Sequence, residues 1–212
     1  MYIGHYAAAA VLVSVVPEAS VAPAAIGVAW PDLLWSALVL LSQEKVTPSR
    51  DSPLQRTVRF DFYPFSHSLL LSNLLAVVPA VIIAFCLQNP MAGVVFWLGS
   101  VSHWILDLIV HEPDLPVTGF SAQGMKMGFG LWRLPKTAYV AEYAFFAVFI
   151  LITAQPSMFA GLLGGGLLLH LLNANSAFAF TTRNPVGTPR RFAVVALVGF
   201  VGAIAWFCAA WQ

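Results

Sequence analysis

Long, uninterrupted runs of apolar residues alternate along the chain with short polar segments. Each run approaches the ~20 residues that a helix needs to cross the hydrocarbon core of a bilayer. The pattern predicts an all-α fold: a polytopic transmembrane helical bundle of six or seven spans, forming a single transmembrane domain over residues 1–212. The six predicted spans are Ala24–Ser42, Ser66–Leu87, Met91–Val110, Ala138–Ala154, Ser157–Ala177 and Phe192–Trp211.

A seventh apolar run, Gly4–Val16, is short for a span and ends in Pro17-Glu18. It predicts one of two structures. The first is a full helix that continues toward Ala22, and the second is one half of a hairpin with the following segment.

Composition identifies lipid as the solvent of much of this chain. Of its 212 residues, 59% are hydrophobic and 9% are charged, whereas soluble domains carry about 25% charged residues. A membrane β-barrel is excluded because its strands alternate apolar and polar residues in segments of about ten. The sequence has no basic stripe, so we expect no nucleic-acid partner.

All ten Lys and Arg residues fall in three longer loops, Gln43–Phe65, His111–Thr137 and Phe178–Arg191. Two predicted spans separate each loop from the next, so the three loops lie on the same side of the membrane. The shorter connections on the other side contain no Lys or Arg. The positive-inside rule therefore predicts that the three basic loops are cytoplasmic.

The strongest candidate for chemistry is a polar stripe near the end of the third predicted span. His103, Asp107 and His111 are spaced i, i+4, i+8 and therefore share one helix face. Pro113 is expected to end the helix, so that Asp114 can fold back toward that face. Imidazoles and carboxylates at this spacing suit a divalent metal, above all zinc, with Asp114 also a candidate catalytic proton acceptor. The alternative is a hydrogen-bonded polar seam that locks helices together.

Three further ionisable residues are predicted as metal ligands. His5 opens the first apolar run, and His67 enters a span on the same side of the membrane as the stripe. Asp32 follows Pro31 inside an apolar run, where a charged group costs about 2.5–3.5 kcal/mol on insertion scales. No Lys or Arg lies in any span, so Asp32 needs a metal, a histidine or a proton. The alternatives are interfacial histidines and a protonated, packed aspartic acid.

Glu142 lies near the start of another span, on the same side as the stripe. It is a candidate catalytic base, a partner that orients a ligand histidine, or an acid that extends to the interface. His170, in the next span, is expected to hydrogen bond between helices. Ser66 and Ser68 flank His67, but adjacent residues on a helix do not face each other, so no Ser–His nucleophile pair is expected.

Several short motifs, in this order, resemble the bacterial YdjM-like family. They are His5 at the start of the first helix, Pro31-Asp32, Ser66-His67-Ser68-Leu69-Leu70 and Ser102-His103-Trp104-Ile105-Leu106-Asp107. The resemblance covers roughly residues 1–145. It implies a protein of the bacterial inner (plasma) membrane that acts as a metal-dependent hydrolase. Through a more distant similarity to zinc-dependent phospholipase C and nuclease proteins, it also implies phosphoester hydrolysis.

One departure from the family bears on the metal count. The family often has a second acid two residues after the aspartate of Pro-Asp, and in this chain that position is Leu34. The resemblance therefore implies a single metal, or none, rather than a multi-metal centre.

Two functional hypotheses come from the sequence. The first is a membrane-embedded metal-dependent hydrolase whose substrate is a phosphoester, a lipid or another amphiphile at the cytoplasmic membrane face. The alternative is a non-enzymatic membrane protein, either a transporter or an accessory subunit of a larger complex. In that case the polar cluster packs helices or handles ions and protons. A membrane-protein partner or a homo-oligomer is compatible with both hypotheses.

Overall fold

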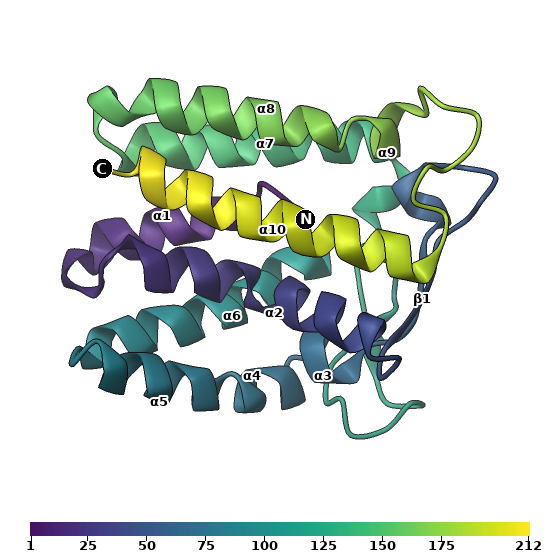
Figure 1. Cartoon of the computed structure of the whole chain (residues 1–212). Helices are drawn as coiled ribbons and strands as arrows, with labels where there is room; N and C mark the ends of the chain where they lie inside the picture. The colour runs from purple at the N-terminus through teal and green to yellow at the C-terminus, as the bar shows by residue number, and fades with distance from the viewer.

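The computed structural model describes residues 1–212 and shows a bundle of roughly parallel and antiparallel helices (Figure 1). Four helices are long and apolar enough to cross a membrane: α2 (Val21–Leu40), α6 (Pro90–Val110), α7 (Pro135–Thr153) and α10 (Pro189–Ala210). At a rise of about 1.5 Å per residue, each is roughly as long as the ~30 Å hydrocarbon core. The predicted all-α class is confirmed in its main part, and the structure is compatible with a membrane protein.

The other predicted spans are shorter helical segments, so the expected six or seven full-length spans are not reproduced as such. The helix α1 (His5–Val15) has 11 residues and forms a hairpin with α2 through a turn at Pro17–Ala19. This is the half-hairpin alternative of the sequence analysis. Two further apolar segments are interrupted: α4 (Leu71–Leu75) and α5 (Val77–Cys86) form one, and a 3₁₀ turn (Pro156–Met158), a π turn (Ala160–Gly164) and α8 (Gly165–Leu172) form the other.

Short strands and helical turns lie at one end of the bundle. Two small antiparallel sheets, β1–β2 and β3–β4, lie in the loops that the sequence analysis described as polar. The bounds of these elements are β1 (Lys45–Thr47), β2 (Arg59–Phe62), α3 (Pro64–His67), β3 (Leu115–Pro116), β4 (Lys126–Met127) and α9 (Asn175–Phe178), with 3₁₀ turns at Gln55–Thr57 and Leu131–Arg133.

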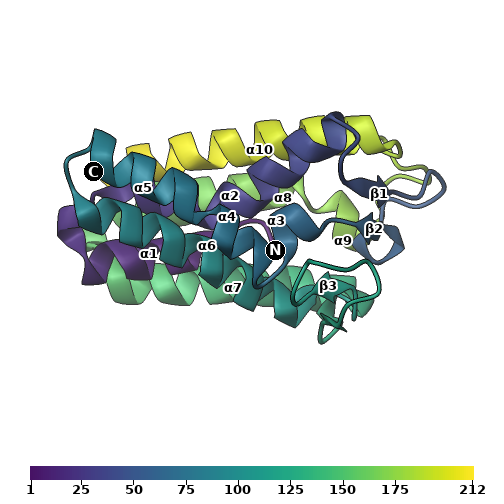
Figure 2. The ribbon, with the colours of Figure 1, turned by 90° about the horizontal axis from the view of Figure 1, so that it is seen from below.

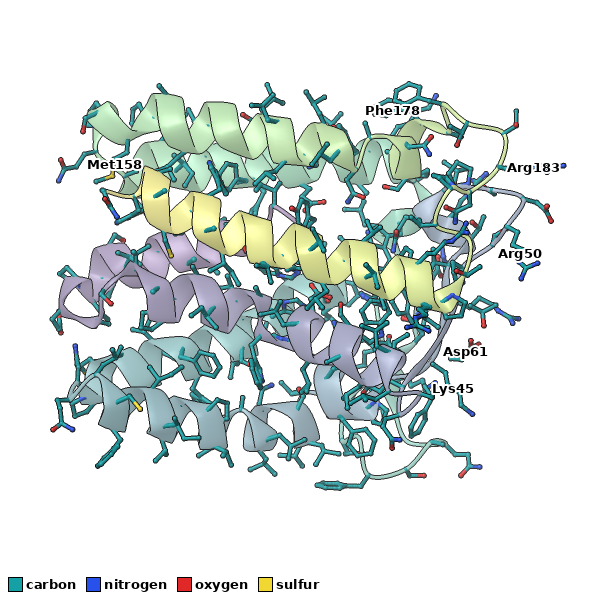
Figure 3. All side chains as sticks on the ribbon, in the orientation of Figure 1. Lys45, Arg50, Asp61, Met158, Phe178 and Arg183 are labelled. Carbon is teal, nitrogen blue, oxygen red and sulfur yellow. The ribbon has the colours of Figure 1, made fainter.

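The three basic loops gather at this same end of the bundle. Seen from below, β1, β2, β3 and α9 lie together at one end of the bundle (Figure 2). Lys45, Arg50 and Arg183 project from that end, whereas Met158 lies at the opposite end (Figure 3). The Asn184 side chain donates a hydrogen bond to the Ser49 carbonyl at 2.8 Å, which ties two of the loops together. The prediction that these loops share one side of the bundle agrees with the structure.

A close helix crossing joins α2 to α6 and depends on glycine. A Cβ atom at Gly27 would lie 2.3 Å from the Phe96 carbonyl oxygen, and one at Gly99 would lie 2.8 Å from the Val28 nitrogen. Such backbone contact is available only to residues without a side chain. The crossing brings the second half of α2 against the second half of α6, where the candidate site lies.

Many large apolar side chains on the outer surface of the bundle are exposed. Examples are Leu168 at 67% and Val198 at 66% exposure. A soluble protein rarely exposes contiguous apolar patches of this kind. The exposed side chains therefore favour a surface that contacts lipid.

Candidate metal centre

Polar side chains from four helices converge inside the bundle, in the half nearest the basic loops. All six predicted metal ligands belong to this cluster: His5 of α1, Asp32 of α2, His67 of α3, His103 and Asp107 of α6, and His111 directly after α6. The four histidines and Asp107 are buried. The Asp32 side chain is 17% exposed, so the cluster is not fully enclosed.

The polar stripe on α6 forms one wall of the cluster. His103 Nε2 lies 3.1 Å from Asp107 Oδ2, and His111 Nε2 lies 3.5 Å from the same oxygen. The predicted shared face is therefore present. The helix ends at Val110, before Pro113, and Asp114 folds back so that its Oδ1 lies 3.1 Å from His111 Nδ1.

The opposite wall comes from α2 and α3. Asp32 Oδ1 lies 3.4 Å from His67 Nε2, and Asp32 Oδ2 lies 3.6 Å from His103 Nε2. His67 Nε2 also lies 3.8 Å from Asp107 Oδ2. Asp32, placed in the interior of α2 after Pro31, thus faces α6 rather than lipid.

His5 completes the cluster from the first turn of α1. Its ring stacks on that of His103, with ring centroids 3.7 Å apart, and its Nε2 lies 3.3 Å from Asp107 Oδ1. The amino group of Met1 also contacts Asp107 Oδ1. The carboxylate of Glu142 accepts hydrogen bonds from the backbone N–H groups of Tyr2 and Gly4 and thereby holds the segment that leads into α1.

The distances between the ligand atoms suit a metal ion. Four atoms bound to a tetrahedral zinc at 2.0–2.1 Å lie roughly 3.3 Å from one another. The four imidazole–carboxylate separations among Asp32, His67, His103 and Asp107 are 3.1 to 3.8 Å, and Asp32 presents one oxygen to each imidazole. Two overlapping groups, His5–His103–Asp107 and Asp32–His67–His103, could each hold an ion.

Hydrogen bonding leaves three ring nitrogens of the cluster without a partner. Nε2 of His103 and both ring nitrogens of His5 are buried and have no hydrogen-bond partner. His103 Nδ1 lies 2.7 Å from the Val28 carbonyl oxygen, which can only accept, so Nδ1 carries the proton. In the neutral ring, the lone pair of Nε2 then faces the carboxylates of Asp32 and Asp107. A cation between them would turn this repulsion into coordination, so the residues present fit a bound metal.

On the side of the loops, the cluster continues through His111, Asp114 and Tyr63. Tyr63 is buried, and its hydroxyl lies 3.3 Å from His111 Nδ1. The Asp114 side chain is 26% exposed, so it contacts both the buried His111 and the solvent at the loop surface. Catalytic use of Asp114 and Glu142 stays a prediction: Asp114 contacts a candidate ligand, whereas the observed contacts of Glu142 are backbone hydrogen bonds.

Two residues next to the cluster were not identified as functional from the sequence. Glu44, in the loop after α2, is buried and accepts hydrogen bonds from Ser66, whose hydroxyl lies 2.8 Å from His67 Nδ1. Ser66 and His67 make contact although they are adjacent, because α3 has only four residues and both side chains are buried at its end. The Ser66 hydroxyl donates to Glu44, so the prediction that the two residues are no nucleophile pair stays a prediction. Nothing in the local sequence around Glu44 distinguishes it from a solvated loop acid.

His170 lies outside the cluster. Its Nε2 lies 2.9 Å from the Tyr139 carbonyl oxygen on α7, which confirms the predicted interhelical hydrogen bond.

Comparisons of this chain with models of protein families, with curated proteins and with solved structures found no match.

Proposed function

We propose that this chain is a membrane-embedded metal-dependent hydrolase. The observation that carries the proposal is the convergence of four imidazoles and two carboxylates in which the buried His103 Nε2 faces Asp32 and Asp107 without a hydrogen bond. The order of motifs that resembles the YdjM-like family supports the same reading.

We infer that the metal is zinc, because the donor set combines imidazole nitrogen and carboxylate oxygen. The primary ligands are Asp32, His67 and His103. Asp107 lies 3.1 Å from His103 Nε2, and His5 lies against its second oxygen. A bound zinc ion would supply a Lewis acid that lowers the pKa of a water molecule and polarises the substrate. Asp114, beside His111 and 26% exposed, is the proposed proton acceptor, whereas Glu142 holds the segment that leads into α1.

The substrate class follows from the depth of the site. His103 and Asp107 lie in the last turns of α6, and His67 ends α3, so the cluster is next to the loops that contain Lys and Arg residues. We propose that this side is cytoplasmic and that the membrane is the inner membrane of a bacterium. A phosphoester or another lipid-like amphiphile in the cytoplasmic headgroup layer is then the natural substrate.

The proposed topology has six crossings with α1 as a half-length helix. In this arrangement α2, α6, α7 and α10 cross as regular helices. The interrupted segments Leu71–Cys86 and Pro156–Leu172 supply the other two crossings. The turn that joins α1 to α2 lies at the end away from the basic loops.

The packing favours an enzyme over a transporter. The half of α1 beyond the cluster, with the residues of α2, α7 and α10 around it, belongs to an apolar core that includes Ala9, Val13, Ala24, Ile150 and Phe207. A path for ions or protons would need polar groups in that half as well. An accessory subunit would need no bound metal, so metal content also tests that alternative.

Elemental analysis of the detergent-purified protein tests the proposal. We expect about one zinc ion per chain in the wild-type protein and little in His103→Ala. His170→Gln is a matched control, because this second buried histidine lies outside the cluster, and it should retain the metal. Metal-loaded wild-type protein should hydrolyse a phosphoester lipid in mixed micelles, and His103→Ala should not. Absence of any divalent metal in correctly folded wild-type protein would refute the proposal.

A further inference from the structure

A chain of hydrogen bonds leads from a buried carboxylate to the back of a ligand histidine. Glu44 is 2% exposed and lies just beyond α2. Its Oε1 accepts the backbone N–H groups of Phe65 and Ser66 at 2.8 and 3.0 Å, and its Oε2 accepts the Ser66 hydroxyl at 2.6 Å. Ser66 Oγ lies 2.8 Å from His67 Nδ1. The ring nitrogen on the other side, His67 Nε2, faces Asp32 and Asp107.

The direction of each hydrogen bond in this chain is fixed by chemistry. An ionised carboxylate can only accept, so the single hydroxyl proton of Ser66 points to Glu44. Ser66 Oγ must then accept from His67, which places the imidazole proton on Nδ1. In the neutral ring, Nε2 consequently keeps its lone pair toward the cluster. Burial raises the pKa of Glu44 to about 7, and the carboxylate is therefore ionised at pH 8.

We propose that Glu44, acting through Ser66, fixes the Nδ1-protonated tautomer of His67 and is thereby a positioning residue of the metal centre. The role in metal binding rests on the proposed function, whereas the tautomer is a property of the metal-free protein as well. Groups that orient a ligand histidine typically change metal affinity 10- to 100-fold when they are replaced.

Glu44→Gln reverses the chain of hydrogen bonds without removing it. The glutamine oxygen can still accept from the two backbone N–H groups, and its NH₂ group then faces Ser66. Because this NH₂ group can only donate, the Ser66 hydroxyl turns and donates to His67 Nδ1. The imidazole proton moves to Nε2, where it blocks coordination. We therefore expect Glu44→Gln to lower zinc affinity at least about tenfold.

Ser66→Ala interrupts the chain instead of reversing it. His67 Nδ1 loses its partner and neither tautomer is imposed, so we expect a smaller loss of affinity than in Glu44→Gln. In the double variant Glu44→Gln/Ser66→Ala, no hydroxyl remains that could donate a hydrogen bond to His67 Nδ1. The double variant should therefore bind zinc more tightly than Glu44→Gln alone and about as well as Ser66→Ala. A merely structural role of Glu44 would make the two losses additive.

The experiment combines two measurements at pH 8 on the full chain in detergent. Zinc affinity is measured by competition with a chromogenic chelator, and the His67 tautomer is read from ¹H–¹⁵N spectra of metal-free, ¹⁵N-histidine-labelled protein, with His67 assigned by replacement. We expect the Nδ1-protonated ring in the wild type and the Nε2-protonated ring in Glu44→Gln. The exposed residue Glu18, at the opposite end of the bundle, provides the control Glu18→Gln, which should change neither measurement.

The two proposals fail in distinguishable ways. If the wild-type protein binds no divalent metal, the proposed function fails, and the spectra of the metal-free protein still show whether Glu44 fixes the His67 tautomer. If the wild type binds zinc but Glu44→Gln keeps the Nδ1-protonated ring and full affinity, the proposed role of Glu44 is overturned. A double variant that binds zinc more weakly than Glu44→Gln would also overturn it.

Discussion

A single methyl group at the crossing of α2 and α6 should move Asp32 of α2 away from His103 of α6 and thereby weaken the proposed metal centre. In Gly27→Ala the new Cβ would lie 2.3 Å from the Phe96 carbonyl oxygen, whereas an ordinary contact begins at 3.4 Å. The helices must therefore separate locally by about 1 Å. The Val28 carbonyl would then move away from His103 Nδ1, now at 2.7 Å, and Asp32 would move away from His103 Nε2, now at 3.6 Å.

The expected consequence has two parts. Overpacking of this kind typically costs about 1–3 kcal/mol of stability, and the widened cluster should lose zinc affinity at least about tenfold. Thermal unfolding in detergent, followed by tryptophan fluorescence, measures the first part, and chelator competition measures the second.

Two other glycines provide matched controls for this prediction. A Cβ at Gly93 would lie 2.4 Å from the Ala80 carbonyl oxygen, in the contact between α5 and α6 and away from the cluster. Gly93→Ala should therefore lower stability and leave zinc affinity unchanged. Nothing lies within 4 Å of a Cβ at Gly202, so Gly202→Ala should change neither quantity. Wild-type zinc affinity in Gly27→Ala, or an equal loss in Gly93→Ala, would show that the α2–α6 distance does not set the metal site.

Two further predictions concern Glu44 and the topology. The pKa of Glu44 is raised by burial from 4.5 to about 7, so the folded protein binds a proton more tightly than the unfolded chain. As the pH rises from about 4.5 to 7, the wild type should lose up to roughly 3 kcal/mol of unfolding free energy relative to Glu44→Gln, and parallel pH profiles of the two proteins would contradict this. In a background without Cys86 and Cys208, a membrane-impermeant maleimide added to spheroplasts should label Ser157→Cys and not Arg183→Cys, whereas the reverse pattern would invert the proposed orientation.

Much of the candidate site could be predicted because it follows helical periodicity. His103, Asp107 and His111 repeat every four residues, and a helix must place them on one face whatever surrounds it. Asp32 could be predicted for a different reason: a carboxylate in an apolar run without a nearby Lys or Arg requires a partner. Both arguments use only local spacing and the cost of charge in lipid.

The parts that could not be predicted depend on contacts between distant segments. Glu44 meets Phe65 and Ser66 because the β1–β2 hairpin folds the intervening loop back on itself, and no local pattern encodes that return. The length of α1 cannot be predicted, because an apolar run of this size is compatible with a full or a half-length helix. The carboxylate of Glu142 holds the backbone just before the start of α1.

The hydrogen bonds behind the histidines distinguish a metal centre from a polar seam. In a seam of neutral histidines, His103 would place its proton on Nε2 and donate it to Asp107. The structure instead commits Nδ1 of His103 to the Val28 carbonyl, and Asp114 accepts from Nδ1 of His111. Because these acceptors come from a neighbouring helix and from a loop, the neutral rings are held with their lone pairs toward buried carboxylates. The Met1 ammonium group contacts one oxygen of Asp107, but it does not contact the lone pair of His103 Nε2. A lone pair that separate elements of the fold hold toward carboxylates is expected of a ligand preorganised for a metal.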